Sequence, residues 1–182
     1  PLEQARDVAR ALAEAQRVVA RAGGDPDRFV LMGHSAGGHL IALLAARPDL
    51  VREAGARPWR ATVLLDAGSV DVVETMTSPR GRIGLFRNAF GDDPAFWRAV
   101  SPMHQLAGKT APILAVCASG RRDSCRANRA FLDKAAGFGT RTQLMEKPLS
   151  HAEINRLFGE DNAYTREVEA FVQSVGGAPR RD

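Results

Sequence analysis

The sequence has 182 residues, of which 45% are hydrophobic and 25% charged, and its formal net charge is +4. This length and composition are ordinary for a globular protein with a single core. No apolar run reaches the roughly 18 residues that a membrane span needs, and the polar opening stretch indicates no signal peptide. The arginines are scattered among acidic residues, so nucleic-acid binding is not expected.

Apolar strand patterns and helical patterns alternate along the chain. In order they predict a helix over 2–22, a strand over 28–32, a helix over 35–46, strands over 60–65 and 112–118, a helix over 127–136, a strand over 141–146 and a helix over 164–175. Residues 66–109 are expected to be loop-rich, and 177–182 to form a disordered tail. This order predicts an α/β fold, a three-layer α/β/α sandwich around a mostly parallel sheet, in one domain spanning 1–176.

The stretch GHSAGG, residues 33–38, joins a predicted strand directly to a predicted helix. So tight a turn forces its central residue, Ser35, into a strained backbone conformation, in which side chains two positions before and after it would collide. Gly33 and Gly37 carry no side chain. The Ser35 hydroxyl would then stand out at the carboxyl end of the sheet. The N–H of Ala36, at the helix N-terminus, is placed to bind an oxyanion.

A serine hydroxyl becomes a good nucleophile only beside a base, and that base needs a carboxylate to orient it. The sequence offers four histidines. His34 adjoins the serine and is expected to point away from its hydroxyl. His39 is expected to pack beneath the turn or to cap a hydrogen bond, and His104 precedes the third strand. His151 directly follows the fourth strand and is the predicted base.

The acid is expected on a loop after a strand, between the serine and the histidine in the chain. Asp123 follows the third strand and is the predicted acid. Asp66 ends the second strand and is its main rival, since some triads take the acid from an earlier strand. Asp66 and Asp71 could equally cap loops, which is the commoner role of such residues.

Cys117 and Cys125 lie close together in the sequence, but two cysteines lack the ligand set of a zinc site. Two reduced thiols and a disulfide that closes a short loop are both open. The disulfide would require an oxidising compartment, so the localisation stays open between cytoplasmic and exported. No metal or organic cofactor is expected.

With these residues in view, the sequence resembles the α/β-hydrolase superfamily, and most of all its hormone-sensitive-lipase and feruloyl-esterase-like carboxylesterases. The similar segments are GGDPDRFVLMGHSAGGHLIALLA, FGDDPAFWRAVSPMHQL, APILAVCASGRRD and LSHAEINRLFG. The resemblance implies that Ser35 is the nucleophile, Asp123 the acid and His151 the base.

Members of that family have several strands before the serine turn and an HGGG-like loop that gives a second oxyanion donor. Here one predicted helix precedes the strand over 28–32, and no such motif is present. The sequence therefore resembles the C-terminal portion of a hydrolase that lacks its N-terminal strands. The strand over 28–32 would be an exposed sheet edge, which invites pairing with another chain, including a second copy of this one.

These inferences predict a serine hydrolase of the carboxylesterase type, which cleaves small carboxylic esters through an acyl-enzyme on Ser35. Two alternatives stay open. One is a serine peptidase or amidase on the same fold, which the same triad would serve. The other is a non-catalytic protein that keeps the hydrolase scaffold for binding a partner.

Overall fold

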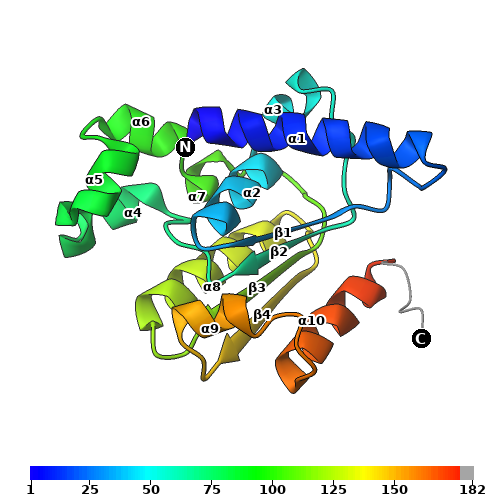
Figure 1. Ribbon diagram of the computed structural model, residues 1–182. Coiled ribbons are helices and arrows are strands. Elements are labelled where there is room, and N and C mark those ends of the chain that lie inside the picture. Colours follow the sequence, from blue (N-terminus) through cyan, green and yellow to red (C-terminus); the bar gives the residue numbers. More distant parts are fainter. Residues whose placement is uncertain (177–182) are drawn as a thin grey trace.

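The computed structural model describes residues 1–176, so the predicted tail over 177–182 lies outside the described residues. Its centre is one sheet of parallel strands in the order β1-β2-β3-β4 (Figure 1). The strands are β1 (Val30–His34), β2 (Ala61–Leu65), β3 (Ile113–Ala118) and β4 (Thr142–Lys147). The predicted parallel sheet is confirmed.

Helices cover both faces of the sheet, so the predicted three-layer arrangement is also confirmed (Figure 1). On one face lie α2 (Ala36–Ala46) and α8 (Arg122–Gly137), and on the other lie α9 (His151–Arg156) and α10 (Ala163–Ser174). Strands β2 and β3 are buried along their whole length, as expected for central strands with helices on both sides. Their side chains alternate between the faces: Leu64 packs with α2 and α8, and Val63 packs with α9 and α10.

The long helix α1 (Leu2–Arg21) lies outside α2, together with the short α3 (Pro48–Glu53) (Figure 1). Its buried stripe includes Ala5, Ala9 and Ala13. These small side chains recur at helical spacing and let α1 approach α2 closely. Strand β1 is half-buried and forms one edge of the sheet among residues 1–176. Pairing of this edge with another strand stays a prediction.

The section over 66–109 was expected to be loop-rich, but it is largely helical. It contains α4 (Val72–Thr77), the 3₁₀ turn η1 (Pro79–Arg82), α5 (Gly84–Phe90), α6 (Pro94–Ala99) and α7 (Pro102–Gln105). Side-chain caps begin several of them, since Asp71 accepts from the Glu74 N–H and Asp93 from the Ala95 N–H. Helices of four to seven residues are too short for hydrophobic periodicity to reveal them.

The two cysteines form a disulfide between β3 and α8, with the Cα atoms of Cys117 and Cys125 5.3 Å apart. This decides between the two alternatives that the sequence left open. None of the helices described over 1–176 is long and apolar enough to cross a membrane.

Candidate active site

Ser35 occupies a strained turn between β1 and α2. Its backbone angles are φ 55° and ψ −115°, a left-handed conformation that non-glycine residues rarely adopt. Three backbone hydrogen bonds fix it in place: its N–H donates to the Leu65 carbonyl at 3.0 Å, and its carbonyl accepts from the N–H groups of Gly68 at 3.3 Å and His39 at 3.1 Å. The turn is therefore tied to the end of β2, and Ala36 begins α2 directly behind the serine.

The glycines around Ser35 serve close backbone approaches. A Cβ at Gly33 would lie 2.6 Å from the backbone carbon and oxygen of Gly37, which no real side chain tolerates. A Cβ at Gly37 would meet nothing within 4 Å, so the collision predicted for that position does not arise there. The second tight position is Gly38, where a Cβ would lie 2.8 Å from the Ala67 Cβ.

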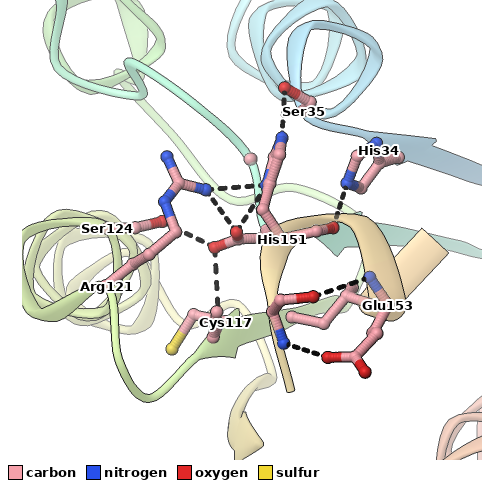
Figure 2. Close-up of polar contacts among 12 residues, drawn as sticks. His34, Ser35, Cys117, Arg121, Ser124, His151 and Glu153 are labelled. Carbon is pink, nitrogen blue, oxygen red and sulfur yellow. Dashed lines mark hydrogen bonds and ion pairs between the residues drawn. The ribbon is translucent and has the colours of Figure 1, made fainter. Parts of the chain in front are cut away.

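His151 is the first residue of α9, and a capping box fixes that helix start. Ser150 Oγ accepts from the Glu153 N–H at 3.2 Å, and the Glu153 carboxylate accepts from the Ser150 N–H at 2.8 Å (Figure 2). The imidazole consequently points toward the serine turn, and His151 Nε2 lies 3.0 Å from Ser35 Oγ (Figure 2). The structure brings these two predicted residues together.

Asp66 provides the carboxylate beside His151. It follows β2 directly with a positive φ of 45°, and its side chain is fully buried. Its Oδ2 lies 2.6 Å from His151 Nδ1, while Oδ1 accepts from the Ser124 hydroxyl at 2.8 Å. Burial by itself raises the pKa of Asp66, but the hydrogen bonds from His151, Ser124 and Arg121 outweigh it and hold that pKa below its usual value.

Asp123, the predicted acid, does not lie at this site. It is in the first turn of α8, its side chain is 70% exposed, and Arg126 lies 3.9 Å from its carboxylate. The reason is that α8 begins at Arg122, several residues before the predicted start of that helix, and its first turn carries Asp123 outward. The carboxylate that the structure sets against His151 is that of its rival, Asp66.

The other histidines lie where they cannot accept a proton from Ser35. His34 Nε2 lies 2.9 Å from the backbone oxygen of His151, and the two rings are 4.3 Å apart (Figure 2). His39 is 4% exposed and donates from Nδ1 to the Ser69 carbonyl at 3.0 Å, and burial lowers its pKa to about 4. His104 lies 3.4 Å from Asp71.

Sequence reasoning missed two side chains of the site. Ser124 donates to Asp66, and Arg121 forms an ion pair with Asp66 while its Nη1 lies 2.7 Å from His151 Nδ1 (Figure 2). The only signal for either was its position in the segment after the third strand, where the acid was expected. The site therefore has a serine, a histidine and a buried carboxylate in contact, with a guanidinium against the last two.

Comparison with known families agrees with this architecture. A family model for the alpha/beta hydrolase fold matches residues 1–120, which is more than half of the 182-residue chain. The chain therefore belongs to the α/β-hydrolase fold family, and the resemblance inferred from its sequence is confirmed. No protein of curated function matches the sequence.

Several solved esterases share the fold. Esterase 2 of Thermogutta terrifontis, phosphoramylated by tabun, is 25% identical with a TM-score of 0.70, and the match covers 97% of this chain and 66% of the esterase. An acetyl ester-xyloside bifunctional hydrolase from Caldicellulosiruptor lactoaceticus is 21% identical with a TM-score of 0.74, covering 98% and 67%. Esterase B from Lactobacillus rhamnosis is 18% identical with a TM-score of 0.71, covering 94% and 61%. This chain thus spans about two thirds of the length of such esterases.

Proposed function

We propose that this chain carries the triad of a serine hydrolase that cleaves small carboxylic esters. One observation carries the proposal: an unbroken row of contacts joins Ser35 Oγ to His151 Nε2, and His151 Nδ1 to the buried carboxylate of Asp66. Base catalysis by a histidine requires a nucleophile and an orienting acid in this geometry. Membership of the α/β-hydrolase family and the likeness to solved esterases support the same reaction.

In the first half of the reaction, His151 Nε2 takes the proton of Ser35 Oγ as that oxygen bonds to the ester carbonyl carbon. The Ala36 N–H donates to the resulting oxyanion, and Asp66 stabilises the imidazolium. When the tetrahedral adduct collapses, the bond between the carbonyl carbon and the alkoxy oxygen breaks. The alcohol leaves with the proton from Nε2, and the acyl group stays on Ser35.

In the second half, a water molecule attacks the acyl carbon and gives a proton to His151 Nε2. Collapse of the second adduct breaks the bond to Ser35 Oγ, which recovers that proton, and the carboxylic acid is released. His151 thus serves as base and acid in turn, and every proton passes through the one nitrogen that faces the serine.

The test is hydrolysis of p-nitrophenyl acetate and p-nitrophenyl butyrate by the wild type and by Ser35→Ala. Loss of the nucleophile is expected to lower kcat by on the order of 10⁶-fold. A fluorophosphonate probe should label the wild type and leave Ser35→Ala unlabelled, because it reacts only with an activated serine. Equal hydrolysis by the two proteins would refute the proposal.

The matching p-nitroanilides separate an esterase from an amidase with the same triad. We expect hydrolysis of the esters and little of the anilides. Absence of both labelling and turnover would instead favour a binding protein with a hydrolase scaffold.

A further inference from the structure

Arg121 places a positive charge inside the triad. Its Nη1 forms an ion pair with Asp66 Oδ2 and lies 2.7 Å from His151 Nδ1, which itself lies 2.6 Å from the same Oδ2 (Figure 2). One carboxylate oxygen is thus shared between a guanidinium and the imidazole that it is proposed to orient. A guanidinium has only donors, so it cannot accept a hydrogen bond from the Nδ1–H.

This contact works against the proposed base. When Arg121 donates to Nδ1, the single proton of neutral His151 lies on Nε2, which faces Ser35 Oγ at 3.0 Å. In that tautomer Nε2 has no lone pair with which to take the serine proton. When the proton lies on Nδ1 instead, the guanidinium still neutralises part of the charge on Asp66 that would stabilise the imidazolium.

Arg121 can leave this position without depriving Asp66 of its other hydrogen-bond donors. Its side chain is 32% exposed, whereas that of Asp66 is fully buried. After its departure Asp66 would keep the Ser124 hydroxyl at 2.8 Å, the Ala118 N–H at 3.4 Å and His151 at 2.6 Å. The buried carboxylate would therefore still be well supplied with hydrogen-bond donors.

A cavity beside Arg121 offers it another partner. Arg80, Arg121 and Arg126 line this cavity together with two carboxylates, Glu74 and Asp123. Arg126 is already engaged, 2.5 Å from Glu74 and 3.9 Å from Asp123. Arg80 stacks over the Phe86 ring at 5.5 Å and has no carboxylate partner among residues 1–176. The cavity thus has three guanidinium groups against two carboxylates.

We propose that Arg121 is a specificity-determining residue that holds the triad at rest, and that a carboxylate on the substrate releases it. The substrate's carboxylate, bound in the cavity by Arg80 and Arg121, draws Arg121 away from Asp66 and leaves Oδ2 to His151. Paired guanidinium groups suit this task because each can bind a carboxylate through two parallel hydrogen bonds. The inference rests on the proposed esterase function and names its substrate class as esters that bear a second, free carboxylate.

The first test compares substrates that differ in one carboxylate. In the first pair, the p-nitrophenyl esters of butyrate and of succinate have acyl groups of the same length, and only the succinate ester carries a free carboxylate. In the second pair, phenyl butyrate and 4-carboxyphenyl butyrate, the free carboxylate is on the alcohol part instead. We expect the wild type to favour the charged member of one pair by at least about ten-fold in kcat/KM, a contact of ordinary charge-assisted strength. Preference in the first pair would place the cavity on the acyl side, and preference in the second on the alcohol side. No preference in either pair would overturn the inference.

The second test removes the guanidinium. Arg121→Gln should raise kcat on the neutral esters by about ten-fold, a fraction of the 10⁴-fold attached to a triad carboxylate, and should abolish the preference for charge. Arg80→Gln should lower kcat/KM for the charged ester by removing one of the two guanidinium groups proposed to bind its carboxylate. The matched control is Arg122→Gln, which removes one exposed charge from the same turn. It should change neither kcat on the neutral esters nor the preference for the charged ester.

A spectroscopic readout separates this role from a structural one. The downfield proton resonance of the Nδ1–H bonded to Asp66 should be weak in the resting wild type and strong in Arg121→Gln. If Ser35→Ala hydrolyses esters like the wild type, the esterase proposal itself fails. If hydrolysis needs Ser35 but Arg121→Gln is slower on neutral esters and keeps the charge preference, only the role of Arg121 is refuted.

Discussion

The loops that follow β2 and β3 reach the same end of the sheet but present opposite charges to His151. The loop after β2 places a carboxylate beside His151, because Asp66 comes directly after Leu65 and its positive φ turns the side chain inward. The loop after β3 places Arg121 beside His151 instead. The carboxylate of that loop, Asp123, points outward on the first turn of α8. Chain order alone therefore does not decide which of two adjacent strands supplies an acid. The decisive factor is how soon the backbone leaves the sheet and in which direction.

Exchanging each carboxylate for its amide tests which of the two loops supplies the proposed acid. Asp66→Asn should lower kcat by about 10⁴-fold, because the amide neither stabilises the imidazolium nor keeps the productive tautomer. Asp123→Asn is the matched control and should stay within about two-fold, since its exposed side chain makes no contact with His151. Steady-state kinetics on p-nitrophenyl butyrate would measure both, and circular dichroism would verify folding. A larger loss in Asp123→Asn would return the acid to α8.

The contact between Ser35 and His151 was predictable because each residue has a local signal in the sequence. Three glycines accompany the serine between a strand and a helix, and His151 is the histidine that directly follows the fourth predicted strand. The parallel sheet followed from its apolar strands, whose predicted bounds lie within two residues of the observed ones.

The carboxylate beside His151 was not predictable in the same way. Asp66 and Asp123 both lie after apolar strands, and neither the φ of residue 66 nor the early start of α8 can be read from local sequence. A helix predicted to start at 127 leaves Asp123 in a loop, whereas the observed start at Arg122 puts it on an exposed helical turn. Arg121 and Ser124 had no signal beyond their position after the third strand, since their contacts with Asp66 join segments more than fifty residues apart.

Acid is expected to destabilise the loop after β2, because His39 anchors that loop through the Ser69 carbonyl. Burial lowers the pKa of His39 from 6.5 to about 4, so the unfolded chain binds a proton there that the folded protein refuses. Its stabilising contribution is therefore complete above pH 6.5 and is lost as the pH falls toward 4. The loss should total about 3 kcal/mol of the unfolding free energy. Urea unfolding between pH 7 and 4 measures it.

The control for this pH dependence is His39→Gln, which keeps a donor for Ser69 but does not titrate. It should be less stable than the wild type at pH 7 and lose this part of the pH dependence. If the unfolding free energy falls equally with pH in the two proteins, other groups cause the acid sensitivity.

The loop after β3 depends instead on a covalent tie, the disulfide between Cys117 and Cys125. The two cysteines are 8 residues apart in the sequence, so their disulfide closes a short loop that contains Arg121 and Ser124. Chain-entropy arguments give such a loop about 2.5 kcal/mol of stabilisation. Chemical denaturation with and without a reductant should reveal that difference in the wild type. The double variant Cys117→Ala, Cys125→Ala should already lack this stabilisation, and a reductant should not change its stability. If the reductant lowers the stability of both proteins equally, the effect does not come from the disulfide.

The smallest expected effect concerns the hydrogen bond that the loop after β3 donates to the Asp66 carboxylate. Ser124→Ala removes the hydroxyl that donates to Asp66 Oδ1 at 2.8 Å. A hydrogen bond to a charged group contributes about 1.5 kcal/mol, so unfolding free energy should fall by that amount. Because this bond helps to lower the pKa of Asp66, its loss should also make activity fail at a higher pH on acidification. Ser119→Ala, which alters an exposed hydroxyl of the same loop, should match the wild type in both measurements. If Ser124→Ala matched it too, the remaining partners of Asp66, which are His151, Arg121 and the Ala118 N–H, would be sufficient to hold it.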